Sequence, residues 1–168
     1  MREEIELRDL YNEKKEVTGK TIEKGAVIPN GYYISVVLTM IRNSKGEFLI
    51  QKRSERKNGL FAATGGHPKK GETPLEGAIT EVKEEIGIDV KKEEMRHLFG
   101  HRFDEVFFDL YYTEKDLDID EFVVDKNEVD YVEWMDIHRI DKLIKDGQFM
   151  KNHAEEFYRT LDILNIKL

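Results

Sequence analysis

The chain has 168 residues, which suits one domain that is large enough to bury a core. Its 35 acidic and 27 basic side chains give a formal charge of −8, which disfavours sequence-independent nucleic-acid binding. Cysteine is absent, which excludes disulfides, thiolate metal sites and a cysteine nucleophile. The N-terminus has no apolar signal-peptide core, and the longest mostly apolar run, residues 32–41, is too short to cross a bilayer. We therefore expect a soluble, cytoplasmic protein without a membrane span.

Residues 1–31 are expected to form an extension before the main domain. Residues 5–11 alternate partly between apolar and polar side chains, and residues 16–22 predict a short strand pair around Gly19. This extension either belongs to the same domain or forms an arm against a second subunit, which would make the protein a homodimer.

The main domain is expected to begin with a strong strand. Residues 32–42 are a nearly continuous run of β-branched and aromatic side chains, typical of a strand that is buried on both faces. Residues 43–46 predict a turn, and residues 47–53 predict a second strand. The two strands are therefore predicted to form a hairpin.

A helix of about three and a half turns follows, and its ends are marked by the sequence. Thr73 is a suitable N-cap, Pro74 suits the first helical position, and Glu76 completes a capping box. Gly87 is well placed to end the helix in a left-handed conformation.

This helix carries three carboxylates, Glu81, Glu84 and Glu85, within an arc of roughly 100° beside its apolar face. Like charges at i and i+4, here Glu81 and Glu85, cost a bare helix about 0.2–0.5 kcal/mol. A hard divalent cation such as Mg²⁺ turns this repulsion into binding, because it takes carboxylate oxygens and leaves positions for water and phosphate.

The loop before the helix, residues 65–72, is rich in glycine, which lets the backbone approach a ligand closely. Lys69 and Lys70 in this loop can meet the charge of a phosphate. His67 can touch a phosphate or a ring, and packing within the loop is the alternative role for this side chain.

Loop and helix together resemble the Nudix box, written as Gly, five residues, Glu, seven residues, Arg-Glu-aliphatic-any-Glu-Glu-any-Gly-aliphatic. Six of its seven fixed identities are present, at Gly66, Glu72, Glu81, Glu84, Glu85 and Gly87. Val82 and Ile88 fill both aliphatic positions, whereas Thr80 stands where the family usually has Arg. An amphipathic surface helix with a solvated glutamate face is the alternative, but it explains neither the loop nor the spacing.

Beyond the helix, residues 96–103 and 105–113 predict two strands, and the acidic residues 116–120 predict a loop. Residues 129–135 predict a last strand, which is followed by two helical stretches between residues 136 and 164. Strands on both sides of a central helix, with helices that close the fold, favour a mixed β-sheet between helical layers.

The resemblance implies the same α/β architecture, a Nudix-type α/β/α sandwich with a mixed β-sheet. We expect a single domain over residues 1–168. Within it, residues 1–31 would be the extension, residues 32–145 the Nudix core, and residues 146–168 the C-terminal helix.

The resemblance also implies roles for individual residues. Glu81 and Glu85 would be the principal ligands of Mg²⁺ or Mn²⁺, and Glu84 would support a second ion. The residue before the box glycine, Gly65, would offer its backbone carbonyl to the metal. Family members tend to recruit a glutamate from a later loop as ligand or base, and Glu128 at the edge of the final strand is our candidate.

Other candidates have plainer alternatives. A solvated loop carboxylate is the alternative for Glu128, and Glu105 and Glu114 are the next choices for its role. Arg53 and two further cations follow the second strand, where some Nudix proteins hold substrate phosphates. Exposed, solubilising side chains are the alternative for these cations.

Thr80 bears on how Glu84 is held. An Arg at position 80 could pair with Glu84 at i+4, whereas threonine cannot reach it, and Lys83 points about 100° away. We therefore expect Glu84 to be less fixed than usual and metal affinity to be modest. Thr80→Arg is then expected to raise activity at low Mg²⁺.

We weigh three functions. The favoured one is a metal-dependent hydrolase of a small-molecule substrate, a nucleoside diphosphate linked to another moiety, in which positioning and electrostatics supply most of the catalysis. An isopentenyl-diphosphate isomerase is suggested by residues 9–11 and 19–21 and by His67-Pro68, but those isomerases place a catalytic cysteine just before a Ser-His-Pro, which is missing here. A non-catalytic nucleotide sensor is disfavoured by the intact carboxylates, while Thr80 leaves it open.

Overall fold

Strand β3 (Ile34–Arg42) lies at the centre of the sheet, as its apolar composition indicates. In the computed structural model, which describes residues 4–168, β3 runs parallel to β8 (Val106–Glu114) along its whole length. On its other side it pairs antiparallel with the short strand β6 (Thr64–Gly66). The expected burial of this strand is confirmed, because seven of its nine residues are buried.

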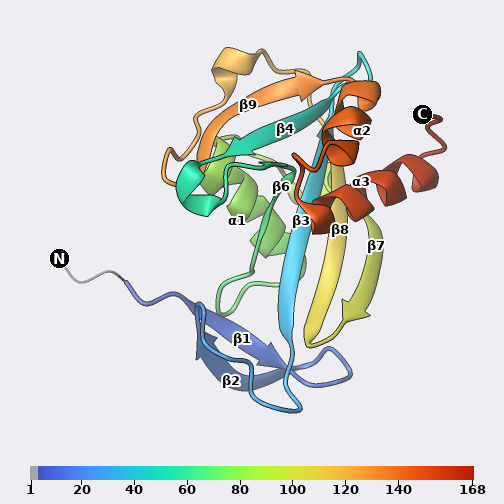
Figure 1. Cartoon of the computed structure of the whole chain (residues 1–168). Helices are drawn as coiled ribbons and strands as arrows, with labels where there is room; N and C mark the ends of the chain where they lie inside the picture. Colours follow the sequence, from blue (N-terminus) through green and yellow to red (C-terminus); the bar gives the residue numbers. More distant parts are fainter. Residues whose placement is uncertain (1–3) are drawn as a thin grey trace.

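Further strands extend the sheet on both sides (Figure 1). Strand β7 (Arg96–Phe103) pairs antiparallel with β8 at one edge. Strand β4 (Phe48–Arg53) pairs antiparallel with β9 (Val129–Met135) and with the two-residue β5 (Phe61–Ala62). The expected hairpin of β3 and β4 amounts to one residue pair beside the turn, because β6 takes the place next to β3 beyond that point.

Helices cover both faces of the sheet (Figure 1). Helix α1 (Pro74–Ile86) packs on one face, whereas α2 (Ile137–Lys145) and α3 (Lys151–Ile163) pack on the other. The α/β/α sandwich with a mixed sheet is therefore confirmed. None of the helices in residues 4–168 is long and apolar enough to span a bilayer.

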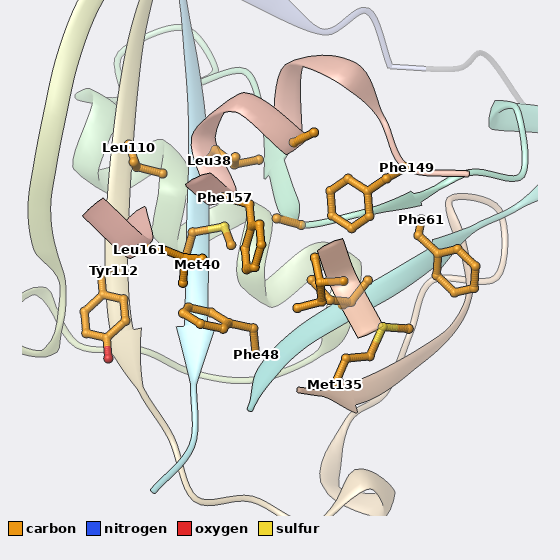
Figure 2. Close-up of a cluster of buried hydrophobic side chains, with 14 residues drawn as sticks. Leu38, Met40, Phe48, Phe61, Leu110, Tyr112, Met135, Phe149, Phe157 and Leu161 are labelled. Carbon is orange, nitrogen blue, oxygen red and sulfur yellow. The ribbon is translucent and has the colours of Figure 1, made fainter. Parts of the chain in front are cut away.

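The two largest hydrophobic clusters of the described residues lie between the sheet and the helices. Figure 2 shows the larger cluster, in which Phe157 of α3 meets Phe48 of β4 edge to face, with ring centroids 5.7 Å apart. On the opposite face, Val82 and Ile86 of α1 are fully buried against β3 and β4. Because consecutive strand residues point to opposite faces, β3 contributes to both clusters.

The ends of α1 are as the sequence predicts. Thr73 Oγ1 accepts a hydrogen bond from the Glu76 N–H at 3.2 Å, and the Glu76 carboxylate accepts one from the Thr73 N–H at 3.3 Å. Gly87 ends the helix with φ +74°, and a Cβ there would lie 2.5 Å from the Val123 carbonyl oxygen. Glycine is therefore required both by the conformation and by the packing.

The N-terminal segment forms a separate two-stranded antiparallel sheet of β1 (Leu7–Tyr11) and β2 (Val17–Glu23). The prediction that the chain turns at Gly19 was wrong. The turn lies at residues 12–16, where the Asn12 side chain accepts hydrogen bonds from two backbone N–H groups. Gly19 lies inside β2 with φ +82°, where the register with β1 shifts, as in a β-bulge.

This hairpin, β1 and β2 with their turn, docks on its own domain. The backbones of Tyr11 and Tyr33 exchange two hydrogen bonds, of 2.8 and 2.9 Å. Lys15 in the turn forms an ion pair of 2.7 Å with the buried Asp109 of β8. The hairpin is thereby tied to the central strands, and β1 lies beside the loop that leads into α1 (Figure 1).

Candidate active site

A cleft of about 530 Å³ lies between α1, the end of β4, the start of α3 and the N-terminal hairpin. It is strongly charged, with acidic and basic side chains at both ends. The acidic lining residues are Glu6, Glu81, Glu84, Glu85, Asp125 and Glu128. The basic lining residues are Arg8, Lys24, Arg53 and Lys57.

Helix α1 brings Glu81, Glu84 and Glu85 together along one wall of the cleft. The orientation follows from packing, because Val82 and Ile86 are fully buried and turn the neighbouring carboxylates towards the cleft. Glu81 and Glu85 are partly buried, whereas Glu84 lies at the exposed rim. The arc of negative charge is therefore set into the protein rather than spread over its surface.

Burial and mutual repulsion make these carboxyl groups hard to ionise. Burial, with the charge of Glu84 adding to it, raises the pKa of Glu81 to about 7. Burial, with the charge of Glu81 adding to it, raises the pKa of Glu85 to about 8. The Glu85 Oε2 atom is buried and has no hydrogen-bond partner within residues 4–168. A positive charge placed between these groups would lower both pKa values.

These donors fit a hard divalent cation, because buried carboxylate oxygens without a neutralising partner are the ligands that such a cation takes. As the side chains lie, no three acidic or histidine groups of the described residues stand close enough to hold a metal ion. Glu84 is paired with Lys69 through one carboxylate oxygen. The Lys69 ammonium group therefore competes with a metal ion for this carboxylate.

Two glycines of β6 allow the loop to approach these groups. A Cβ on Gly66 would lie 2.4 Å from the Glu81 carboxyl carbon, so a larger residue would push the carboxylate aside. A Cβ on Gly65 would lie 2.5 Å from the Val37 carbonyl oxygen. Gly65, the candidate carbonyl donor, lines the cleft together with Gly66. Glycine at both positions is therefore explained by close packing.

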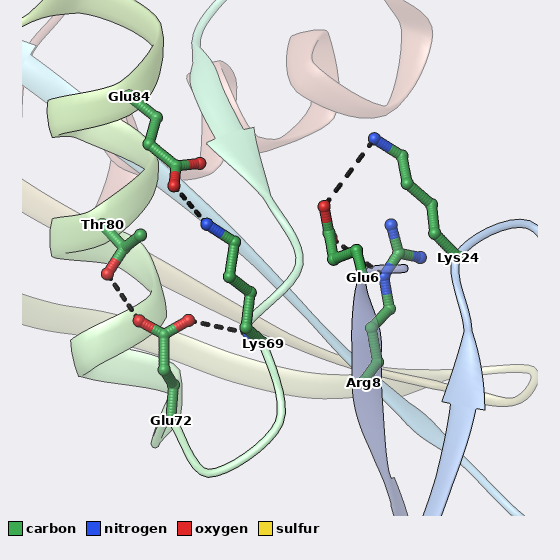
Figure 3. Close-up of polar contacts among 7 residues, drawn as sticks. All are labelled: Glu6, Arg8, Lys24, Lys69, Glu72, Thr80 and Glu84. Carbon is green, nitrogen blue, oxygen red and sulfur yellow. Dashed lines mark hydrogen bonds and ion pairs between the residues drawn. The ribbon is translucent and has the colours of Figure 1, made fainter. Parts of the chain in front are cut away.

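Figure 3 shows how Glu84 and Thr80 are held. The Lys69 ammonium group donates a hydrogen bond to the Glu84 carboxylate and is the basic partner that Thr80 and Lys83 do not supply. The expectation that Glu84 is less fixed than usual stays a prediction. Although its partial burial acts in the opposite direction, the hydrogen bond and charge of Glu84 raise the pKa of Lys69. The Thr80 hydroxyl instead donates to Glu72, which also accepts a hydrogen bond of 2.7 Å from the Lys69 N–H.

Of the two remaining loop candidates, His67 lines the cleft and Lys70 does not. His67 lines the cleft, and burial, with the nearby charges of Arg8 and Lys24, lowers its pKa to about 4. It is therefore neutral at pH 7 and offers hydrogen bonds rather than charge. The Lys70 side chain is exposed and does not line the cleft, while its backbone N–H donates to the Leu7 carbonyl oxygen at 2.8 Å.

At the other end, Arg53 and Glu128 both line the cleft. Glu128 forms an ion pair of 3.1 Å with Lys57. Glu105 and Glu114, the next choices, lie outside the lining: Glu105 precedes β8, and Glu114 accepts a hydrogen bond of 2.9 Å from Tyr112. Placement in the fold therefore favours Glu128 among the three.

Sequence reasoning missed lining residues from both termini of the chain. The hairpin contributes Glu6, Arg8 and Lys24, and the start of α3 contributes Asn152 and His153. Burial, with the charge of nearby Arg53, lowers the pKa of the His153 imidazole to about 4. No local signal separates these residues from ordinary surface side chains, because only docking of the hairpin and α3 brings them to the cleft.

Residues 32–157 match the NUDIX domain family. The chain is 35% identical over 148 residues to a Nudix hydrolase of Listeria monocytogenes, and the match covers 84% of this chain and 86% of that protein. The crystal structure of DR0079 from Deinococcus radiodurans is similar with a TM-score of 0.76 at 25% identity, over 92% of this chain and 98% of that one. The NUDIX domain of Shewanella oneidensis NrtR, complexed with ADP ribose, shares the fold at 12% identity with a TM-score of 0.63, over 79% of this chain and 88% of that one.

Proposed function

This chain belongs to the Nudix family, and we propose that it is a divalent-metal-dependent pyrophosphohydrolase whose substrate is a nucleoside diphosphate linked to another moiety. The observation that carries this proposal is the meeting of Glu81, Glu84 and Glu85 in one cleft. Burial and mutual repulsion raise the pKa values of Glu81 and Glu85 although Lys69 and Arg53 act in the opposite direction, so the negative charge of the two carboxyl groups is incompletely compensated. Such perturbed groups in a cleft are typical of functional sites.

The residues fit roles in this reaction as follows. Glu81 and Glu85, supported by Glu84 and the Gly65 carbonyl, would hold Mg²⁺ or Mn²⁺, which polarises phosphoryl oxygens and acidifies a bound water. The glycines of β6 let a diphosphate lie close to the backbone. In our proposal, Glu128 accepts a proton from the attacking water at the edge of the cleft.

Cations and polar groups around the carboxylates would orient the diphosphate. Arg53 lines the cleft beside Glu85 and His153. Its guanidinium group can donate charge-assisted hydrogen bonds to phosphate oxygens. Lys69 can turn from Glu84 towards a phosphate once the carboxylate is otherwise neutralised. His67 is neutral at pH 7 and offers a hydrogen bond without adding charge.

The test is a release assay with Mg²⁺ or Mn²⁺ on ADP-ribose, dinucleoside polyphosphates, oxidised nucleotides, sugar nucleotides and isoprenoid diphosphates. Glu85→Gln keeps the size of the side chain but removes its charge, so we expect turnover to fall roughly a hundredfold or more. Glu93→Gln makes the same change at an exposed glutamate outside the cleft and should leave turnover unchanged.

Two outcomes contradict the proposal. Equal activity of Glu85→Gln and Glu93→Gln would remove Glu85 from the reaction. Tight binding of a nucleotide without any hydrolysis by the wild-type protein would favour a sensing role, and product isomers instead of hydrolysis products would favour an isomerase.

A further inference from the structure

The N-terminal hairpin presents three charged side chains, Glu6, Arg8 and Lys24, which we call the hairpin cluster. They line the cleft across from Lys69 and Glu84 (Figure 3). The Glu6 carboxylate lies between the two cations, 3.6 Å from the Arg8 Nε atom and 4.0 Å from the Lys24 Nζ atom. Both distances exceed those of good hydrogen bonds.

Arg8 is the least satisfied member of this cluster. Its side chain is only 12% exposed, and its buried Nε–H group has no hydrogen-bond partner in residues 4–168. A guanidinium group carries five N–H donors in a rigid fork. A buried donor without an acceptor costs free energy, so this site favours the arrival of an acceptor with several oxygens.

The hairpin is held so that Arg8 stays at the cleft. On either side of Arg8, the Leu7 carbonyl oxygen accepts a hydrogen bond from the Lys70 N–H at 2.8 Å, and the Asp9 carboxylate accepts one from the Gly71 N–H at 2.8 Å. Both donors belong to the glycine-rich loop that leads into α1. The position of Arg8 is therefore coupled directly to the loop that shapes the candidate site.

At the other end of the cleft, Lys57 is paired with Glu128 at 3.1 Å. The Arg53 guanidinium contacts the Met150 sulfur, a weak and uncharged acceptor, so Arg53 stays available to phosphate as proposed above. Within residues 4–168, the only ion pair of Arg8 is the loose contact with Glu6. An anionic group that enters the cleft therefore meets a second donor site at the hairpin, where a buried N–H group has no acceptor among the described residues.

We propose that Arg8, flanked by Lys24, binds a phosphoryl group of the substrate, and that Glu6 occupies this position in the free protein. The proposal rests on the proposed hydrolase function and adds the hairpin to its substrate site. Phosphate oxygens match the guanidinium fork in geometry and charge, whereas the Glu6 carboxylate reaches it only at 3.6 Å. Binding of the substrate then displaces Glu6 from Arg8.

The sharpest test uses α,β-methylene-ADP, which cannot be hydrolysed at its diphosphate, and measures its Kd by calorimetry with saturating Mg²⁺. Loss of a charge-assisted donor in Arg8→Gln should weaken binding roughly tenfold. Loss of the competing carboxylate in Glu6→Gln should strengthen binding by roughly threefold or more. The opposite signs separate this role from general loosening of the hairpin.

Two neighbouring residues in the hairpin turn supply matched controls. Lys14→Gln and Glu13→Gln make the same charge changes at exposed positions outside the cleft, and both should keep the wild-type Kd. Arg8→Lys keeps the charge without the fork and should recover part of the affinity, which provides a test if Arg8→Gln fails to fold.

The proposal is overturned if Arg8→Gln binds the analogue as tightly as Lys14→Gln does, or if Glu6→Gln binds no more tightly than Glu13→Gln. Hydrolysis assays keep this failure apart from failure of the proposed function. Activity that depends on Glu85 but not on Arg8 would contradict the hairpin role alone. Arg8-dependent binding without hydrolysis of any compound would support the hairpin role and contradict the hydrolase.

Discussion

Lys69 and Glu84 form an ion pair that joins the glycine-rich loop to helix α1 across 15 positions of sequence. This pair supplies the cation that the family pattern would place at position 80. Thr80 instead donates a hydrogen bond to Glu72, which ties the loop to the first half of the helix. Where the Nudix pattern would have one pair between Arg at position 80 and Glu84, this chain has two interactions, Lys69 with Glu84 and Thr80 with Glu72.

Removal of the Lys69 charge should strengthen metal binding. In Lys69→Gln, the Glu84 carboxylate no longer has an ammonium group that competes with a cation. Because both side chains are partly exposed, we expect only a two- to fivefold gain in Mn²⁺ affinity, about what a surface ion pair contributes. Calorimetric titration without substrate measures it, and Lys70→Gln is the control. Weaker Mn²⁺ binding by Lys69→Gln would mean that Lys69 positions Glu84 for the metal.

The Thr80 hydroxyl should contribute to stability. Thr80→Val keeps the shape but removes the hydrogen bond to Glu72, so we expect a loss of about 1 kcal/mol in the free energy of unfolding. For a chain of this size, that corresponds to a fall in Tm of about 2–4 °C. Thr80→Ser retains the hydroxyl and should lose less. Equal Tm values for Thr80→Val and the wild type would show that the bond is not formed in solution.

Position 80 also allows a test of how Glu84 is neutralised. The sequence alone predicts a gain in activity at low Mg²⁺ for Thr80→Arg. With Lys69 already on Glu84, we expect the curves of turnover against Mg²⁺ for Thr80→Arg and the wild type to superimpose. A gain in Thr80→Arg that is as large in the Lys69→Gln background as in the wild type would show that Lys69 does not neutralise Glu84.

Gly66 should be needed for the site rather than for the fold. In Gly66→Ala the three atoms nearest to the new methyl group belong to the end of the Glu81 side chain, which can rotate away. We expect secondary structure and Tm to be kept, while displacement of Glu81 weakens Mn²⁺ binding roughly tenfold. Circular dichroism and calorimetry on one preparation measure both. Wild-type metal affinity in Gly66→Ala would show that Glu81 does not take part in binding.

The stability of the metal-free protein should depend on pH through Glu85. Its pKa is about 8 in the folded protein and 4.5 when unperturbed, so the folded state binds the additional proton between these values. Stability is therefore expected to fall as pH rises from about 4.5 to 8 and to level off above. Glu85→Gln should flatten this slope and be more stable at high pH by on the order of a few kcal/mol. Urea unfolding with a chelator measures the slope, and an identical slope in Glu85→Gln would contradict the shift.

Several features of this protein follow from the sequence by itself, because their causes are local. The caps of α1 depend on residues three or four positions apart, and the three carboxylates share one side because of helical geometry. Runs of apolar side chains indicated the strands, since a buried strand needs little else. The loop and helix motif, which rests on spacing, was sufficient to identify the family.

Only the tertiary structure shows the features that depend on contacts between segments far apart in the sequence. The Lys69–Glu84 pair, the separation of β4 from β3, and the place of Arg8 in the cleft all depend on which segments pack together. A lysine or arginine in a short amphipathic segment has the same local pattern whether it is solvated or faces a ligand. Arg8 is buried, with an Nε–H group that has no partner within residues 4–168, only in the folded protein, because packing of segments that are far apart in sequence removes water from the guanidinium group.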